Sequence, residues 1–242
     1  MKDRIPIRAV GFDIDGTLYP NFLMYLLSLP SFFSAPRLTW AFAWARREMR
    51  RLGMTGDFRL NQAELTARRL GRDTGEIQTL IEERLYRSWE RSFRFLFPLP
   101  YVEEVLRELR GRGLKLGALS DFPVQNKLAY LGLEGLWDAA LSSEEIGCLK
   151  PRPEPFQELA RRLQTPPEAI LYVGNSYACD ILGARQAGMR TAYLCRRRFV
   201  PRSLRVDPPE TLPDLVFSDY RDLPRFLEEE ERKGRVYYHG PA

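Results

Sequence analysis

The chain alternates short apolar runs with longer amphipathic segments, and this pattern predicts the order of its elements. An apolar run at 7–13 ends in Asp13, and further runs lie at 114–119, 138–142, 170–173, 191–194 and 215–217. Helical periodicity lies between them, at 101–112, 124–131, 153–163, 177–187 and 222–231. Buried strands that alternate with helices are typical of a parallel sheet covered on both faces. We therefore predict an α/β fold with a Rossmann-like, doubly wound parallel sheet.

Residues 20–97 follow a different pattern, because helical periodicity runs through them without a convincing strand. Pro36 is typical of a helix start, and Asn61 is a candidate N-cap. Since this block follows the first strand, we expect it to lie over the carboxyl end of that strand. The predicted organisation is a core domain at 1–19 and 98–231, a helical cap domain at 20–97 and a tail at 232–242.

The most apolar part of the cap runs from Phe22 to Trp44. Pro30, Pro36 and Arg37 divide it into pieces too short to cross about 30 Å of hydrocarbon as one helix. The pattern favours a buried helical hairpin. Peripheral contact with a membrane or with an apolar substrate is the alternative.

Composition narrows the class of protein. With 44% hydrophobic and 29% charged residues among 242, the chain is typical of a globular protein large enough for a sizeable core. Its three cysteines show no paired spacing, which argues against a disulfide framework or a zinc site. The net charge is +5, but the basic residues are mostly scattered among acidic ones. This pattern favours small anionic ligands over nucleic acid. Asp13 and Asp15 interrupt the first apolar run, unlike a secretory signal, so we do not expect export. Together with the unpaired cysteines this favours a cytoplasmic protein, which we expect to be a monomer or homodimer.

Polar residues follow three of the predicted strands: Asp13 with Asp15, Ser120 with Asp121, and Asn175 with Ser176. Ligands of parallel sheets bind at the carboxyl ends of the strands. Two carboxylates this close raise one pKa or require a cation, and oxygen ligands suit Mg²⁺. In such a site one aspartate can attack phosphorus while the other transfers protons.

These residues resemble the motifs of haloacid dehalogenase-superfamily hydrolases, of subfamily I with a helical C1-type cap, similar to phosphoglycolate phosphatases. Residues 12–18 (FDIDGTL) match the DxDGT motif, and Leu119 with Ser120 matches the second motif. Lys150 and Pro151 resemble the third motif, and the stretch 174–189 resembles the metal-binding motif. The four motifs occur in the family's order.

The resemblance implies the roles of these residues. Asp13 is expected to be the nucleophile, Asp15 the general acid and base, Ser120 a phosphoryl hydrogen-bond donor and Lys150 a neutralising cation. The implied phosphate-binding set is Asp13, Gly16, Thr17, Ser120, Asp121 and Lys150. The implied Mg²⁺ ligands are Asp13, Asp15, Asn175 and Asp180. Together they imply a magnesium-dependent phosphatase that hydrolyses a small phosphorylated metabolite through an aspartyl-phosphate.

Two residues depart from the family pattern. Asn175 stands where the family most often has Asp, so metal binding is expected to weaken or to rest on Asp180. Asp121 stands where Asn is common, and its charge would repel phosphate unless it is paired. These departures keep a catalytically weakened binding protein as an alternative. A sugar phosphomutase is a second alternative, because it shares the same core. Dehalogenase relatives lack an acid at the position of Asp15, which disfavours that reaction.

The cap offers two further patterns. Arg46, Arg47, Arg50 and Arg51 form helical pairs that suit a solvated basic face or contact with an anionic substrate. Trp40, Phe42 and Trp44 suit packing between cap helices, with an apolar pocket as the alternative. His239 lies in the predicted tail, away from the motifs.

Overall fold

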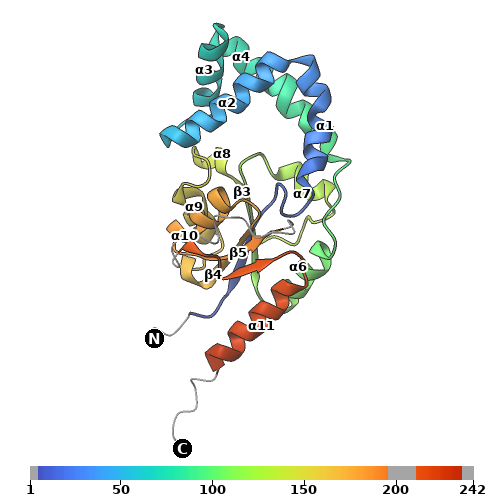
Figure 1. Cartoon of the computed structure of the whole chain (residues 1–242), viewed down its shortest axis with the longest axis vertical. Coiled ribbons are helices and arrows are strands. Elements are labelled where there is room, and N and C mark those ends of the chain that lie inside the picture. Colours follow the sequence, from blue (N-terminus) through green and yellow to red (C-terminus); the bar gives the residue numbers. More distant parts are fainter. Residues whose placement is uncertain (1–4, 196–210, 236–242) are drawn as a thin grey trace, which may run out of the picture.

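The computed structural model describes residues 5–195 and 211–235 and contains a six-stranded parallel sheet (Figure 1). The strands are β1 (Ala9–Asp13), β2 (Lys115–Ser120), β3 (Ala139–Ser142), β4 (Ile170–Gly174), β5 (Arg190–Leu194) and β6 (Leu215–Phe217). Their order in the sheet is β3-β2-β1-β4-β5-β6, so β1 lies between β2 and β4. The predicted fold class is confirmed.

Helices cover both faces of this sheet. They are α6 (Val102–Gly111), α7 (Gln125–Tyr130), α8 (Ser143–Ile146), α9 (Pro153–Arg162), η2 (Pro167–Ala169), η3 (Tyr177–Ile181), α10 (Leu182–Gln186) and α11 (Asp222–Arg235). Successive residues of β1 point to opposite faces. Val10 therefore packs in a cluster with Leu106 of α6, whereas Ala9 packs in a separate cluster with Leu159 of α9. This double coverage explains why the strands are apolar throughout.

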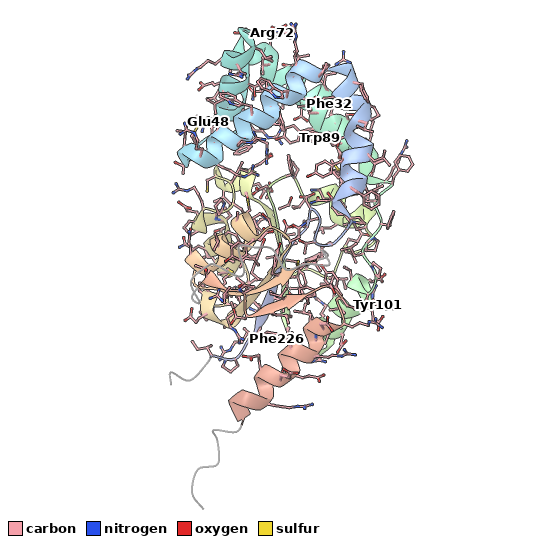
Figure 2. The ribbon with its side chains drawn as sticks, viewed as in Figure 1. Phe32, Glu48, Arg72, Trp89, Tyr101 and Phe226 are labelled. Atoms are coloured by element: carbon pink, nitrogen blue, oxygen red, sulfur yellow. The ribbon has the colours of Figure 1, made fainter. Side chains whose placement is uncertain are left out.

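A block of helices lies above the carboxyl ends of the strands (Figure 1). Its elements are α1 (Asn21–Ser34), α2 (Pro36–Leu52), α3 (Phe58–Leu70), α4 (Thr74–Ile81), η1 (Glu82–Tyr86) and α5 (Arg87–Phe93). Trp89 lies in this upper part of the molecule (Figure 2) and packs edge-on against Phe42 and Tyr86 within the block and against Phe122 of the core. The chain leaves the sheet after β1 and returns to it after α6, so the block is inserted between the first two strands of the chain.

The caps of two helices differ in how well the sequence predicted them. Pro36 is the first residue of α2, as predicted. The N-cap of α3 is Asp57, whose side chain accepts a hydrogen bond from the N–H of Leu60, and Asn61 lies inside the helix. The prediction for Asn61 was wrong because Asp57, an equally good capping residue, precedes it by one turn.

The hairpin predicted at 22–44 is only half-buried. Leu23 and Leu27 of α1 pack on the main core cluster, but Tyr25 and Phe33 are 71% and 73% exposed. Both faces of α1 are apolar, so burying one face leaves the other exposed. In α2, Phe42 is buried as expected, whereas Trp40 is 54% exposed beneath the guanidinium of Arg69. Within the described residues no helix has the length and hydropathy to span a bilayer.

Two helices in the second half differ in detail from the prediction. The helix expected at 177–187 consists of the π-helix η3 followed by α10. Helix α11 extends to Arg235, so the first four residues of the predicted tail are helical. His239 lies outside the described residues.

Candidate active site

The ends of three neighbouring strands bring the predicted motifs together. Asp13 ends β1 and pairs in register with Leu119, one residue before Ser120 at the end of β2. On the other side of β1, β4 ends at Gly174, just before Asn175. Residues that are more than 100 positions apart in sequence therefore meet at one edge of the sheet.

Asp13 is held on both carboxylate oxygens. Its Oδ1 accepts a hydrogen bond from Nζ of Lys150 at 2.7 Å, and its Oδ2 accepts one from Oγ1 of Thr17 at 2.7 Å. The tight turn between Asp13 and Thr17 depends on Gly16, which has a φ of 89°. A Cβ at Gly16 would lie 2.1 Å from Nδ2 of Asn175, so this turn also packs against the fourth motif.

Lys150 joins Asp13 to Asp180. Its Nζ donates to Oδ1 of Asp180 at 2.6 Å, and Oδ2 of Asp180 accepts the N–H of Ser176 at 2.9 Å. The carboxylate of Asp180 packs directly on Gly174, where an added Cβ would lie 2.3 Å from Cβ of Asp180. The glycine that ends β4 therefore makes room for this carboxylate.

Burial and charge set the protonation of this group. Burial and the charge of Asp180 raise the pKa of Asp13 to about 7, although Lys150 acts to lower it. Burial would lower the pKa of Lys150, but Asp13 and Asp180 raise it well above its usual value. Two buried carboxylates share one ammonium group, which leaves an excess of negative charge.

Asp15 faces a different set of partners. Its Oδ2 accepts a hydrogen bond from Oγ of Ser120 at 2.5 Å, and its Oδ1 accepts from Nζ of Lys127 at 2.7 Å and from the hydroxyl of Tyr19. Burial acts to raise the pKa of Asp15, but the charge of Lys127 and the hydrogen bonds of Lys127, Ser120 and Tyr19 lower it overall.

Sequence analysis did not single out Lys127 or Tyr19. Lys127 is 1% exposed and Tyr19 is fully buried. A lysine in the short helix after Ser120, among the apolar residues of KLAYLGL, was the available signal. Tyr19 lies four residues after Asp15, within the turn that follows the first motif.

Asp121 is paired and does not point a bare charge at Ser120. Its Oδ2 lies 2.6 Å from Nη2 of Arg50, and its Oδ1 accepts the N–H of Lys150 at 3.1 Å. Burial acts to raise the pKa of Asp121, but Arg50, Lys150 and Arg46 hold it below its usual value. The repulsion expected from sequence is therefore compensated.

Arg46 provides a second link between α2 and the core. Its Nη1 lies 2.5 Å from Oε1 of Glu144, its Nη2 lies 2.5 Å from the carbonyl oxygen of Asp121, and its guanidinium stacks 3.9 Å from the ring centroid of Phe122. The four arginines, predicted to form a solvated basic face or to contact an anionic substrate, therefore differ in their environment. Arg46 is buried, whereas Arg47 is exposed.

The carboxylates are not pre-arranged around a cation. In residues 5–195 and 211–235, no three His, Cys, Asp or Glu side chains are grouped as a metal site. Lys150 lies between Asp13 and Asp180, and Asp15 faces Lys127. The Mg²⁺ ligands named from the sequence therefore stay a prediction. The donors still suit Mg²⁺ chemically, since Asp13 and Asp180 are hard oxygen ligands with an excess of negative charge.

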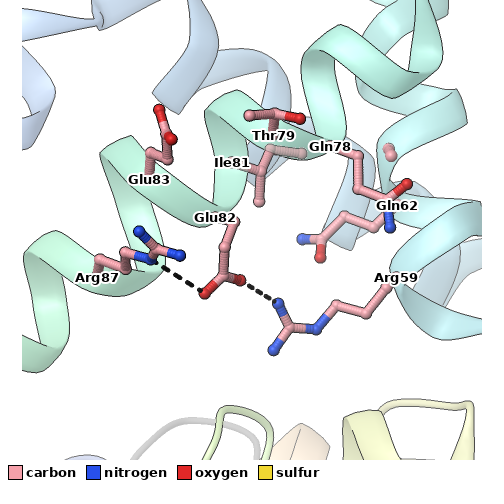
Figure 3. Close-up of a pocket in the computed structure, with 9 residues that line it drawn as sticks. Arg59, Gln62, Gln78, Thr79, Ile81, Glu82, Glu83 and Arg87 are labelled. Carbon is pink, nitrogen blue, oxygen red and sulfur yellow. Dashed lines mark hydrogen bonds and ion pairs between the residues drawn. The ribbon is translucent and has the colours of Figure 1, made fainter.

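A separate cavity of about 350 Å³ lies within the helical block. Figure 3 shows Glu82 of η1 between Arg59 and Arg87, with Nη1 of Arg59 3.0 Å from Oε2 of Glu82. Gln62 and Gln78 add amide groups to its wall. None of the predicted motif residues lines this cavity, so it is distinct from the group around Asp13.

Two phosphatases are similar to this chain over most of its length. A glyceraldehyde 3-phosphate phosphatase from Methanopyrus kandleri is 33% identical, over 90% of this chain and 95% of its own length. A phosphoglycolate phosphatase from Salmonella paratyphi A is 28% identical, over 90% of this chain and 91% of its own.

Solved structures agree on the fold. A HAD phosphatase from Thermococcus onnurineus superposes with a TM-score of 0.63 at 25% identity, covering 91% of this chain and 98% of its own. A 2-haloacid dehalogenase from Pseudomonas syringae superposes with a TM-score of 0.64 at 26% identity, covering 92% and 99%. The model of the haloacid dehalogenase-like hydrolase family matches residues 7–188, which contain every predicted site residue. The chain therefore belongs to the haloacid dehalogenase-like hydrolases.

Proposed function

We propose that this enzyme is a magnesium-dependent phosphatase that hydrolyses a small phosphomonoester through an aspartyl-phosphate on Asp13. The observation that carries the proposal is the pairing of Asp13 with Lys150 at 2.7 Å, beside Asp15 and Ser120 at the adjacent strand end. A carboxylate held by a buried cation, next to a second carboxylate with hydrogen-bond donors around it, suits nucleophilic attack with proton transfer.

In the first step, Asp13 attacks phosphorus and the bond from phosphorus to the ester oxygen breaks. Asp15 enters this step as the carboxylic acid and donates its proton to that oxygen, which leaves as an alcohol. Thr17 holds Asp13 in place, while Ser120 and Lys150 stabilise negative charge on the transferring group. Phosphoryl transfer depends mainly on such positioning and charge stabilisation.

In the second step, Asp15 accepts a proton from water as that water attacks the phosphorus of the aspartyl-phosphate. The bond to Asp13 breaks, inorganic phosphate leaves and both carboxylates return to their first state. Asp121 assists the phosphate-binding set indirectly, because its carboxylate holds the N–H of Lys150 and the side chain of Arg50.

Magnesium would neutralise phosphate oxygens and the excess negative charge of the carboxylates. Asp13 and Asp180 are the proposed side-chain ligands, with Asp15 and the amide oxygen of Asn175 as further oxygen donors. Nζ of Lys150 lies between Oδ1 of Asp13 and Oδ1 of Asp180, so a cation bound by both carboxylates would compete with this lysine for their oxygens.

Residues 20–97 are proposed to act as the cap over a core formed by 1–19 and 98–231. The contacts of Arg46 and Arg50 with Glu144 and Asp121 support this role, because they tie α2 to the loops beside the site. The relatives named above suggest a small phosphorylated metabolite as the substrate. We propose a cytoplasmic location, a monomer or homodimer, and no nucleic-acid partner.

Among the alternatives, a weakened binding protein loses one of its two arguments because Asp121 is paired. The other argument, that Asn175 is a weaker metal ligand than the usual Asp, still applies. A sugar phosphomutase shares these residues and would differ in transferring the phosphoryl group to a sugar rather than to water. No contact among the described residues favours that acceptor.

The test is hydrolysis of p-nitrophenyl phosphate with and without Mg²⁺ by the wild type, Asp13→Asn and the control Asp219→Asn. Asp219 pairs with Arg221 on the surface, outside the motif group. We expect magnesium-dependent activity in the wild type and in the control, and its loss in Asp13→Asn. Activity that survives Asp13→Asn would exclude the aspartyl-phosphate mechanism, and equal, negligible rates throughout would support the binding protein.

A further inference from the structure

A buried lysine outside the predicted motifs contacts the proposed acid and base. Lys127 is 1% exposed, and its Nζ lies 2.7 Å from Oδ1 of Asp15 and 3.5 Å from Oγ of Ser120. The ring centroids of Phe93 and Phe122 lie 5.3 and 5.8 Å from the same Nζ. These rings shield the ammonium from water, so its contact with Asp15 is strong and directional.

Burying an ammonium group is costly unless it is paired and hydrogen-bonded. Lys127 comes from α7, which packs beside α5 of the helical block, so both the core and the block enclose it. An apolar side chain would fill the same space without this cost. The lysine is therefore better explained by what it does to Asp15 than by packing.

The hydrogen bonds on Asp15 fix the direction of its carboxylate. Ser120 occupies Oδ2, while Lys127 and Tyr19 both donate to Oδ1. Lys150 meanwhile holds Asp13 and Asp180 on the other side of the site. Without Lys127, the carboxylate of Asp15 would keep Ser120 and Tyr19 but lose its only charged donor among these contacts, and its rotation would be less restricted.

We propose that Lys127 is a positioning residue, which holds the carboxylate of Asp15 where it can donate a proton to the leaving oxygen. The inference rests on the proposed role of Asp15 and goes beyond it, because it assigns a task to a residue outside the four motifs. Lys127 acts through Asp15 and does not itself exchange a proton with the substrate.

The proposal predicts an effect that depends on the leaving group. During attack by Asp13, the ester oxygen leaves with the bonding electron pair and needs a proton from Asp15 unless it is already a stable anion. p-Nitrophenolate leaves readily without a proton, whereas phenolate is a poorer leaving group. Since kcat/KM reports on the steps up to release of the alcohol, it isolates this proton donation from the later attack of water.

The experiment compares kcat/KM for p-nitrophenyl phosphate and phenyl phosphate, with saturating Mg²⁺, in the wild type, Lys127→Met and Tyr19→Phe. General acid catalysis contributes about 10² to 10⁴ in rate, and a misplaced acid loses part of this factor. We expect Lys127→Met to lower kcat/KM for phenyl phosphate about 10-fold more than for p-nitrophenyl phosphate. Tyr19→Phe keeps the charge and should change the ratio in the same direction by less.

Lys115→Met is the matched control. Nζ of Lys115 donates to the carbonyl oxygen of Leu163 at 2.7 Å, at the start of β2 and at the opposite end of that strand from Ser120. This variant should keep the wild-type ratio between the two esters. Thermal unfolding of each variant separates loss of folded protein, which lowers both rates equally, from a change in the ratio.

The outcomes separate this inference from the proposed function. If the wild type hydrolyses both esters and folded Lys127→Met lowers both rates by the same factor, Lys127 does not position the acid. If Lys127→Met does not fold, Lys127→Gln takes its place, and an unchanged ratio in folded Lys127→Gln overturns the inference. If Asp13→Asn keeps its activity, the proposed function itself fails.

Discussion

Nη2 of Arg50 in the helical block lies 2.6 Å from Oδ2 of Asp121, the residue after the strand-end Ser120. Nε of the same arginine donates to the carbonyl oxygen of Lys150 at 3.2 Å. One side chain thus ties the block to two of the loops that carry the proposed phosphate-binding residues. This contact also compensates the charge that the sequence introduces beside Ser120.

Replacing Arg50 by Met should lower kcat/KM for p-nitrophenyl phosphate. Asp121 would then carry an unpaired charge near the incoming phosphate, and a penalty of about 1.4 kcal/mol corresponds to a tenfold loss. The double variant Arg50→Met with Asp121→Asn should recover part of that loss, because it removes the charge as well as its partner. Steady-state kinetics of both variants check this.

Arg47→Met is the control for Arg50, since Arg47 is exposed on the same helix. It should leave kcat/KM within about twofold of the wild type, as expected for a surface substitution. No recovery in the double variant would mean that Arg50 does more than neutralise Asp121.

The buried pair of Arg46 and Glu144 should dominate the stability of the contact between block and core. Their side chains are 4% and 5% exposed, and Nη1 of Arg46 lies 2.5 Å from Oε1 of Glu144. Arg46→Met leaves a buried carboxylate whose remaining contacts are the hydroxyl of Tyr86 and the more distant charge of Arg59 at 3.4 Å. We expect a loss of about 3 kcal/mol in the free energy of unfolding, because breaking a buried pair costs more than replacing both members.

Urea unfolding of Arg46→Met and of the double variant with Glu144→Gln tests this pair. The double variant should be more stable than Arg46→Met alone. Equal stability would show that Glu144 is already satisfied by Arg59 and Tyr86, whose hydroxyl lies 2.8 Å from Oε1 of Glu144.

Gly174→Ala should disturb Asp180 without changing any charge. The added methyl group would lie 2.3 Å from Cβ of Asp180 and must push that carboxylate away from Lys150. We expect a loss of about 1–3 kcal/mol in the free energy of unfolding. We also expect half-maximal activity to require a higher Mg²⁺ concentration, because a displaced Asp180 would bind the ion less tightly. Thermal unfolding and a magnesium titration of the hydrolysis rate measure the two effects.

Gly111→Ala is the matched control, because a Cβ at Gly111 in α6 meets no atom within 4 Å. Alanine in that helix should be neutral or stabilising by up to about 1 kcal/mol. If Gly174→Ala behaved like Gly111→Ala, Asp180 would not require its tight packing against β4.

The sequence predicted the parallel sheet because each strand is a short apolar run with a turn residue or polar residue after it. It also predicted that Asp13, Ser120 and Asn175 share one edge, since parallel strands end together. Asn61 was misplaced because Asp57 offers an equal cap one turn earlier. Which of the two residues caps the helix depends on where the preceding loop ends. The local sequence pattern does not define that point.

The contacts between side chains that are distant in sequence could not be predicted from the sequence. Nothing near Asp121 indicates that Arg50, 71 residues earlier, supplies its counter-ion. Lys127 likewise has the local pattern of an ordinary helical lysine, and only the packing of α7 against the strand ends brings it to Asp15. The exposed face of α1 was not predicted because apolarity on every side of a helix does not say which side is covered.

The central claim is that Asp13 becomes phosphorylated during turnover. Asp15→Asn should slow the attack of water on the aspartyl-phosphate, so the intermediate should accumulate with p-nitrophenyl phosphate, whose leaving group needs no proton. We would quench this variant with acid, digest it and locate the phosphoryl group by mass spectrometry. The account predicts one phosphoryl group on the peptide that contains Asp13, at that residue. A phosphoryl group on another residue, or turnover with none on Asp13, would contradict it.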